Sequence, residues 1–167
     1  MSYITTLLNP SHLKAIFTCG KDVLDNYLHT QAKQDVKRKI TACFVLAEAD
    51  NSIKGFYTLS SAALNRDDLP VAILKKLPPA YQHLPTTLLG RLAVDIKYKG
   101  KGLGALLLMD ALKRSYQNSL QIASMAVIVD PLDDEAKQFY KYYGFIELPS
   151  SGKMFIPMVQ LETLFNI

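Results

Sequence analysis

Only two of the 167 residues are cysteines, and neither lies in a metal-binding or redox motif. Cys19 and Cys43 are far apart in the sequence, form no CxxC pair, and have no histidine at ligand spacing. This pattern argues against a zinc site, and we expect no metal cofactor. We expect instead two reduced thiols that are mostly buried.

The sequence also lacks long apolar runs, targeting patterns and internal repeats. No stretch is apolar enough over a sufficient length to cross a bilayer, and the N-terminus has no signal-peptide pattern. Hydrophobic residues make up 49% of the chain and charged residues 20%, which is the balance of a globular protein and not of a disordered one. We therefore expect a soluble, cytoplasmic protein with one domain over residues 1–167.

Net charge is modest, at +4 with a pI of about 9.0, and this alone indicates an anionic partner only weakly. The basic residues are clustered. For any single cluster a solvated surface is the simpler interpretation, and contact with an anion is the alternative. The clusters are Lys33, Lys37, Arg38 and Lys39; Lys75 and Lys76; and Lys97, Lys99 and Lys101.

Hydrophobic periodicity predicts strands and helices in alternation, and therefore an α/β (α+β) fold with a mixed central sheet flanked by helices. The predicted helices are Lys21–Arg38, Leu103–Tyr116 and Asp133–Tyr143, the last capped by Gly144. The predicted strands are Thr41–Glu48 and Ile53–Ser61, which form a hairpin, then Leu88–Asp95, Ile122–Asp130, Phe145–Leu148 and Phe155–Leu161. Asn65–Pro85 is predicted to be a loop with one helical turn at Val71–Lys76, and Gly90 indicates a bulge in its strand.

A glycine-rich turn joins the strand that ends at Asp95 to the helix that begins at Leu103. Gly100, Gly102 and Gly104 alternate there, beside Lys99 and Lys101. Such a turn exposes backbone N–H groups at the positive end of a helix dipole, where a phosphate can approach closely. The spacing differs from both the P-loop and GxGxxG. We therefore expect a pyrophosphate site, with a simple tight turn as the alternative.

Two segments resemble the signatures of the GNAT acetyltransferase family. The family's acetyl-CoA loop reads Gln/Arg-x-x-Gly-x-Gly/Ala, and Lys99, Gly102 and Gly104 occupy those places, with lysine in place of Gln or Arg. Residues 139–145, Phe-Tyr-Lys-Tyr-Tyr-Gly-Phe, resemble its second signature. The resemblance implies the GNAT fold and acetyl-CoA as donor. It implies cofactor contacts from Leu92, Ala93, Val94, Lys99, Gly100, Lys101, Gly102, Leu103, Gly104 and Phe139.

A narrower resemblance covers most of the chain. Leu88–Asp95, the early Cys-Gly-x-x-x-Leu and the late Phe155–Met158 are similar to the GNAT toxins of toxin–antitoxin pairs. These toxins acetylate aminoacyl-tRNA. The resemblance implies a tRNA substrate, a ribbon-helix-helix antitoxin and a homodimer. Candidate contacts to tRNA phosphates are Lys33, Lys37, Arg38, Lys75, Lys76 and Arg91.

Tyr140 matches the family tyrosine that protonates the departing thiolate, and we expect it to be the catalytic acid. The alternative is core packing, because Ala136, Phe139, Tyr140 and Tyr143 share helical spacing. The strand Leu88–Val94 carries no carboxylate that could act as general base. An α-amino group, with a pKa near 8, does not require a strong base. Glu48, acting through water, remains open as a base.

Arg91 also has two interpretations, an ion pair with Asp95 or contact with an RNA phosphate. For the whole chain, the alternatives to the toxin are a small-molecule or protein N-acetyltransferase and a non-catalytic binding module of the same fold. The intact glycines and Tyr140 argue against the binding module. The basic clusters and the absent carboxylate favour the toxin.

Overall fold

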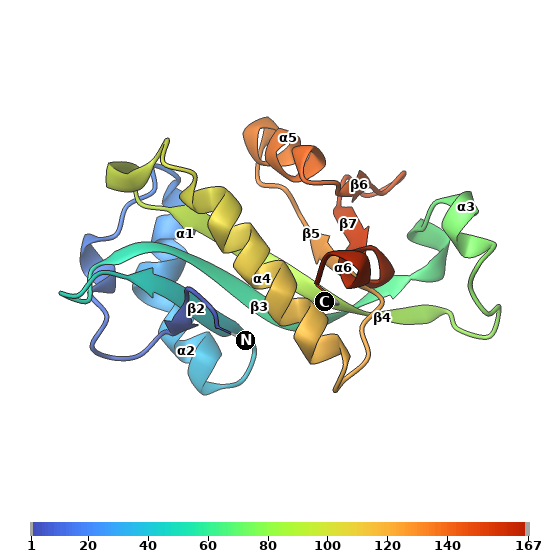
Figure 1. The fold of residues 1–167 in the computed structure, drawn as a ribbon, viewed down its shortest axis with the longest axis horizontal. Helices are drawn as coiled ribbons and strands as arrows, with labels where there is room; N and C mark the ends of the chain where they lie inside the picture. Colours follow the sequence, from blue (N-terminus) through green and yellow to red (C-terminus); the bar gives the residue numbers. More distant parts are fainter. Residues whose placement is uncertain (1, 166–167) are drawn as a thin grey trace. The chain divides into compact units, whose positions relative to one another are not determined.

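The computed structural model describes residues 2–165 and contains a mixed sheet of seven strands in the order β1-β2-β3-β4-β5-β7-β6 (Figure 1). β4 and β5 are parallel, whereas the pairs β1–β2, β2–β3, β5–β7 and β6–β7 are antiparallel. The predicted α+β class and mixed sheet are confirmed. The strands are β1 Thr6–Leu7, β2 Ala42–Ala47, β3 Ile53–Asn65, β4 His83–Val94, β5 Ala126–Val129, β6 Ile146–Glu147 and β7 Met154–Pro157.

The structure contains helices where Leu103–Tyr116 and Asp133–Tyr143 were predicted, and also a C-terminal helix that was not predicted. They are α1 Asp22–Asn26, α2 Ala32–Lys37, α3 Val71–Leu74, α4 Leu103–Ser119, α5 Asp134–Tyr142 and α6 Met158–Phe165. Short 3-10 turns occur at η1 Lys14–Ile16, η3 Arg66–Asp68 and η4 Ile96–Tyr98. Within residues 2–165, no helix is both long and apolar enough to cross a membrane.

The chain divides into two compact units, each made of two sequence segments. The first unit comprises the residues up to Ser60 and Leu89–Leu112, and the second comprises Ser61–Leu88 and the residues from Lys113 onward. The single domain expected over residues 1–167 stays a prediction. The two units are described separately below.

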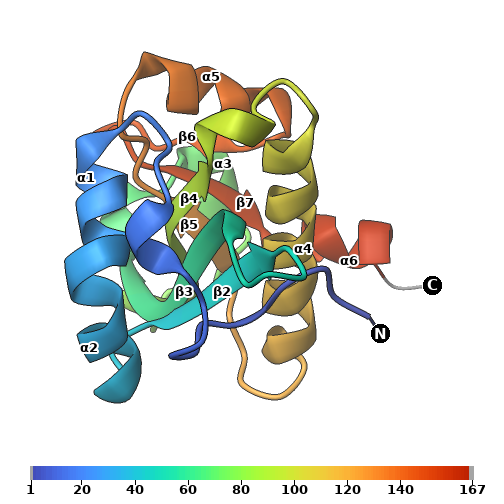
Figure 2. The same cartoon turned by 90° about the vertical axis from the view of Figure 1, so that its left-hand side faces the viewer.

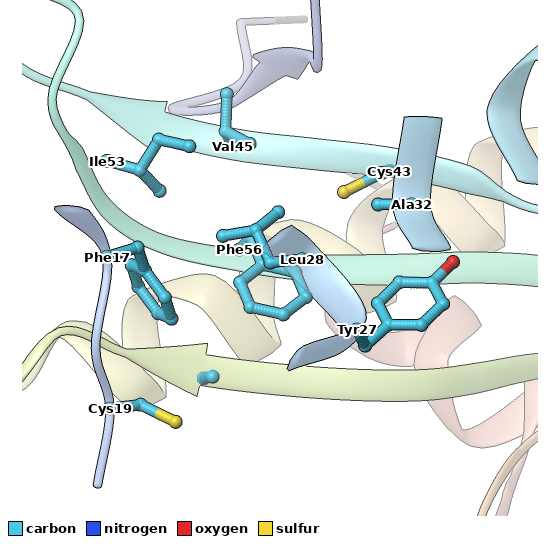
Figure 3. Packing of buried hydrophobic residues seen from close by; sticks show 10 residues of the cluster. Phe17, Cys19, Tyr27, Leu28, Ala32, Cys43, Val45, Ile53 and Phe56 are labelled. Carbon is cyan, nitrogen blue, oxygen red and sulfur yellow. The ribbon is translucent and has the colours of Figure 1, made fainter. Parts of the chain in front are cut away.

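In the first unit, α1 and α2 cover one face of β2, β3 and β4, and α4 lies on the other face (Figure 2). The cluster beneath α1 and α2 is shown in Figure 3. Its buried members are Phe17, Cys19, Tyr27, Leu28, Ala32, Cys43, Val45, Ile53, Phe56 and Ala93. Both cysteines are free and buried, as expected.

The predicted helix Lys21–Arg38 is helical but not uniform. A π-helical turn, η2, occupies Tyr27–Gln31 between α1 and α2. Val23, in the first turn of α1 and ahead of the π turn, is 66% exposed. Tyr27 and Leu28, within the π turn, are buried.

On the opposite face, the buried carboxylate of Asp110 in α4 joins three parts of the first unit. Its Oδ1 accepts the backbone N–H of Ile4 at 2.8 Å, and its Oδ2 accepts the hydroxyls of Tyr57 at 2.7 Å and Thr5 at 2.5 Å. Charge-assisted bonds of this kind are among the stronger ones in proteins. They fix the N-terminal segment and β3 to the helix that follows the glycine turn.

In the second unit, a separate cluster forms around β5 and β7 and includes Leu64, Leu84, Ile128 and Phe155. Several predicted strand boundaries are wrong here. β3 extends beyond Ser61 to Asn65, and β4 begins at His83 instead of Leu88, which shortens the predicted loop Asn65–Pro85. Ile122 is 71% exposed and precedes β5, which begins only at Ala126. β7 ends at Pro157, and the chain continues as α6, because Met158 and Leu161 are three residues apart and are both buried.

Candidate active site

The turn between β4 and α4 is held at its start by a buried carboxylate. Asp95 is 2% exposed, and its side chain accepts the backbone N–H of Lys97 at 3.0 Å and of Thr18 at 3.1 Å. The first bond caps the 3-10 turn η4. Because both carboxylate oxygens are used, the position at which the glycine segment leaves the sheet is well defined.

The glycines of this turn have conformations that other residues rarely adopt. Gly100 and Gly102 both have φ of +79°, and a Cβ placed on either would have no neighbour within 4 Å. The glycines are therefore needed for their backbone conformation and not to relieve crowding within the protein. They leave open space beside the backbone that a ligand can enter.

The helix that follows presents its N-terminus to this space. The N–H of Leu106 donates to the carbonyl of Gly102 at 3.2 Å, which is the first helical bond after the turn. The N–H groups of Leu103, Gly104 and Ala105 precede it and have no acceptor within the helix. Together with the dipole of the 17-residue helix α4, these groups favour an anion such as a pyrophosphate.

The two lysines of the turn are exposed, and each has a nearby neighbour. The ammonium group of Lys101 lies 5.7 Å from the centroid of the Tyr98 ring. The ammonium group of Lys99 lies 3.7 Å from where a Cβ on Gly20 would be. Lys99 therefore keeps a positive charge where the family pattern has Gln or Arg, but it lacks the planar fork of arginine.

Not every residue of β4 that precedes the turn has a side chain accessible to a ligand. Ala93 is 5% exposed and belongs to the cluster beneath α1 and α2. Leu92 and Val94 alternate with it and are half-buried. Any contact from Ala93 to a cofactor must therefore use its backbone. The bulge at Gly90 stays a prediction.

Glu48 is poorly suited to act as general base. Its carboxylate forms an ion pair with Lys54 at 2.9 Å and accepts the hydroxyl of Tyr98 at 3.2 Å. The hydrogen bond from Lys54 holds the pKa of Glu48 below its usual value. A carboxylate so stabilised has a weaker tendency to accept a proton.

Arg91 does not form an ion pair with Asp95, one of its two interpretations from the sequence, because the oxygens of Asp95 cap η4 and bind the backbone of Thr18. Its guanidinium carbon lies 3.4 Å from the centroid of the Tyr27 ring. Arg91 lies two residues before Ala93 on β4 and so on the same face of the strand, and Ala93 belongs to the cluster that includes Tyr27. Tyr27 was not recognised from the sequence, because its partner is 64 positions away and no local pattern joins them.

In the second unit, Tyr140 lies in α5 within a group of aromatic rings. It is 7% exposed, and its ring centroid is 5.3 Å from that of Phe139 and 5.2 Å from that of Phe145. Phe139, half-buried, also contacts Tyr143. The neighbouring Tyr142 is 81% exposed. The ring of Tyr140 thus packs in the core, as its helical spacing indicates.

The hydroxyl of Tyr140 has a different environment from its packed ring. Within residues 2–165 no hydrogen bond holds this hydroxyl. Burial raises the pKa of Tyr140 above its usual value, so the group keeps its proton at neutral pH. It can therefore donate a hydrogen bond. Since an ordinary phenol has a pKa about 1.5 units above that of a thiol, full transfer to a thiolate is unfavourable unless another group replaces the proton.

The candidate RNA contacts fall into separate groups. Lys33 and Lys37 of the α2 region line a surface pocket of about 240 Å³ together with Lys14, which the sequence analysis missed. His12 and Val36 also line this pocket. Arg38 is exposed at the end of α2, and Lys75 and Lys76 are exposed after α3. Within residues 2–165, no three His, Cys, Asp or Glu side chains gather as metal ligands would.

Two curated relatives are similar over most of the chain. A tRNA-acetylating toxin of Mycobacterium tuberculosis is 37% identical over 129 residues, which cover 77% of this chain and 75% of that protein. A probable toxin TacT of Sinorhizobium fredii is 31% identical, over 95% of this chain and 93% of that protein.

Solved structures show the same fold. AtaT complexed with acetyl-methionyl-tRNAfMet has a TM-score of 0.89 and 29% identity, over 98% of this chain and 99% of that one. A Tyr-to-Phe mutant of AtaT, bound to the C-terminus of the antitoxin AtaR and to acetyl-CoA, has a TM-score of 0.82 and 26% identity, over 98% of each chain. Residues 40–147 match the acetyltransferase (GNAT) domain. From this match and from the similarity to the two relatives, the chain belongs to the GNAT acetyltransferase family.

Proposed function

We propose that this chain transfers the acetyl group of acetyl-CoA to the α-amino group of an aminoacyl-tRNA and so blocks translation as a toxin. The observation that carries the proposal is similarity along almost the whole chain to tRNA-acetylating toxins. The open glycine turn before α4 supports it, because it supplies the anion site that acetyl-CoA requires.

In this proposal acetyl-CoA is held mainly by backbone groups. The N–H groups of the α4 N-terminus bind the pyrophosphate, with Lys99 and Lys101 adding charge. Leu92, Ala93 and Val94 contact the pantetheine and the acetyl carbonyl through the backbone of β4, and Phe139 contributes an apolar surface. The half-buried Leu92 and Val94, alternating with the buried Ala93, are consistent with such a strand.

The proposed reaction forms a C–N bond and breaks the C–S bond of the thioester. The neutral amine attacks the acetyl carbon, the electron pair of the C–S bond goes to sulfur, and the proton lost by nitrogen balances the proton gained by sulfur. Tyr140 donates the proton to sulfur and regains one from the substrate nitrogen, which becomes strongly acidic after attack. This replacement removes the unfavourable difference in pKa between phenol and thiol.

In this proposal the substrate amine enters the site already deprotonated, because neither β4 nor Glu48 supplies a strong general base. β4 carries no carboxylate between Leu88 and Val94, and Glu48 is engaged by Lys54 and Tyr98. An α-amino group has a pKa near 8, and the ester of an aminoacyl-tRNA lowers it further, whereas lysine has about 10.4. These values favour an aminoacyl ester over a lysine side chain as acceptor.

We further propose that Lys33, Lys37, Arg38, Lys75, Lys76 and Arg91 contact tRNA phosphates. Phosphate contacts supply affinity and salt dependence but little sequence choice. We also propose that a ribbon-helix-helix antitoxin binds this chain and that the chain forms a homodimer. The proposed substrate makes the cytoplasm its site of action.

The test is translation in vitro with purified protein, with and without acetyl-CoA, followed by mass analysis of the recovered charged tRNA. We expect arrest only when acetyl-CoA is present, and an added acetyl group on the amino acid. Acetylation of free amines or of protein lysines, with charged tRNA left unmodified, would replace this proposal by the small-molecule or protein acetyltransferase. Arrest without acetyl-CoA would indicate a binding module.

A further inference from the structure

Arg91 is a half-buried cation with an unusual environment. Within residues 2–165 no carboxylate pairs with it, and its guanidinium carbon lies 3.4 Å from the centroid of the Tyr27 ring. At this distance the flat face of the guanidinium lies on the ring. Its N–H groups, which lie in the guanidinium plane, point away from the ring and can still bind an acceptor.

Tyr27 is itself held in place from the other end. The residue is 7% exposed, and its hydroxyl donates to Oδ2 of Asp35 at 3.0 Å. The side-chain amide of Gln31 donates to Oδ1 of Asp35 at 3.0 Å. Figure 3 shows the Tyr27 ring at one end of the buried cluster that includes Phe17 and Phe56. The ring therefore has little freedom to move.

The backbone that carries Tyr27 is also unusual. Tyr27 begins the π-helical turn η2, which interrupts an otherwise α-helical segment. Turns of this kind are rare, less stable than α-helix, and common at functional positions. The turn is what places Tyr27 over Arg91 while α2 still presents Asp35 to the Tyr27 hydroxyl.

We propose that Tyr27, held by Asp35, is a positioning residue that orients Arg91 to bind a phosphate of the RNA acceptor through two parallel N–H groups. The inference rests on the proposed function. A guanidinium already stacked on a fixed ring loses less freedom when it binds, and its planar fork fits two phosphate oxygens. The competing explanation is that the stack only fills the core.

Three substitutions separate these explanations. Tyr27→Leu removes the ring, Tyr27→Phe keeps the ring but loses the bond to Asp35, and Arg91→Lys keeps the charge but loses the flat face. Phe17→Leu is the matched control, because Phe17 is a ring of the same buried cluster whose aromatic neighbour is Phe56 and not a cation.

We expect Tyr27→Leu and Arg91→Lys each to raise the KM for charged tRNA about 5- to 10-fold. Tyr27→Phe should raise it by about twofold, because the ring remains. In all three, kcat and the Kd for acetyl-CoA should stay within about twofold of wild type. Phe17→Leu should leave the KM for charged tRNA unchanged. An equal rise in KM for Phe17→Leu would show that loss of core packing is the cause and would overturn the inference.

A double substitution tests whether Tyr27 acts through Arg91. In an Arg91→Gln background, Tyr27→Leu should add no further increase in KM, whereas independent effects would multiply. Multiplication would overturn the inference. If Tyr27→Leu does not fold, the same comparison is made with Tyr27→Phe. The stack can also be followed without RNA, because the ring current of Tyr27 should displace the Arg91 Nε proton signal in NMR, and Tyr27→Leu should abolish the displacement.

These readouts keep the two proposals apart. If wild-type protein does not acetylate charged tRNA, the proposed function fails and the phosphate role of Arg91 fails with it. If wild type does acetylate charged tRNA but the effects of Tyr27→Leu and Arg91→Gln multiply, only the positioning role is lost. A wild-type Arg91 Nε signal that Tyr27→Leu does not move would likewise overturn the positioning role alone.

Discussion

The ring and the hydroxyl of Tyr140 have different tasks, and substitution can separate them. Phenylalanine keeps the ring contacts with Phe139 and Phe145 and removes only the hydroxyl. We predict that Tyr140→Phe lowers kcat by about 10²- to 10⁴-fold, the usual range for a lost general acid. The Kd for acetyl-CoA, measured by calorimetry, should change less than about twofold. Turnover within a few-fold of wild type would show that Tyr140 only packs.

The raised pKa of Tyr140 leads to a second prediction, in alkaline solution. The folded protein should hold Tyr140 protonated above pH 10, where an exposed tyrosine ionises. We expect Tyr140→Phe to leave the tyrosinate absorbance of the native protein unchanged up to about pH 10.5. A lower native absorbance in Tyr140→Phe than in wild type at this pH would show that Tyr140 ionises in the folded protein.

The raised pKa of Tyr140 also makes the free energy of unfolding depend on pH, and the direction of that dependence follows from linkage. Because the folded pKa of Tyr140 lies above the unfolded one, its contribution is complete below about pH 10 and is lost as the pH rises further. Denaturant unfolding at pH 8 and pH 10.5 should show wild type losing more stability than Tyr140→Phe. An equal loss in both proteins would indicate that Tyr140 ionises freely in the folded state.

Residues in local motifs were predictable, whereas pairs of residues distant in the sequence were not. The helical position of Tyr140 and the turn at Gly100 and Gly102 were predictable because each lies in a short pattern beside a helix. The stack of Arg91 on Tyr27 and the gathering of Lys14 with Lys33 depend on tertiary packing. Of the two interpretations of Arg91, the ion pair with Asp95 is not formed, because Asp95 caps a 3-10 turn, which the sequence does not reveal.

At the scale of elements, the glycine turn can be tested against a second turn with the same backbone conformation. Gly102 has φ of +79° and Gly152 has φ of +75°, and neither would place a Cβ near another atom. Valine at either position should therefore cause similar backbone strain, on the order of 1–3 kcal/mol. We predict that only Gly102→Val abolishes acetyl-CoA binding in calorimetry. Intact binding in Gly102→Val, or equal loss in Gly152→Val, would remove the acetyl-CoA site from this turn.

The crossing of α4 over β3 depends on one glycine. A Cβ on Gly55 would lie 2.6 Å from Cδ1 of Leu107 and 2.9 Å from the carbonyl oxygen of Ala93. The leucine can rotate, but the backbone oxygen cannot. We predict that Gly55→Ala lowers the free energy of unfolding by about 1–3 kcal/mol, measured with denaturant. Adding Leu107→Ala should not restore stability, and full restoration would show that the leucine was the only obstacle.

Elements were predictable where the pattern was long and were misplaced where it was short. The 17 residues of α4 repeat the helical pattern often enough to identify it, and the β2–β3 hairpin is marked by Asp50-Asn51. The end of β7 was misplaced because Pro157-Met158-Val159 is apolar in either conformation. Only the packing of Met158 and Leu161 on one side decides for a helix.

At the scale of the whole molecule, charge should control RNA affinity without affecting the cofactor. We predict that reversing Lys33, Lys37 and Arg38 to Glu weakens tRNA binding and reduces the salt slope by roughly 0.7 for each lost contact to single-stranded RNA. Acetyl-CoA affinity should be unchanged. Reversal of Lys141 and Lys153, which are also exposed, is the control. Equal salt slopes for the two sets would mean that the charges near α2 serve only solubility.

The π-helical turn at Tyr27–Gln31 also has a consequence for how this chain can vary. One residue of an α-helix corresponds to a rotation of about 100°. The wider π turn takes up one extra residue locally, so a deletion within Tyr27–Gln31 would restore regular α-helix and leave α1 and α2 in nearly the same phase. A deletion between Ala32 and Asp35, in regular α-helix, would instead rotate Tyr27 relative to Asp35 by about 100° and break their hydrogen bond, although neither residue had been substituted. The π turn is therefore the place in this helical segment where a change in residue count is tolerated best.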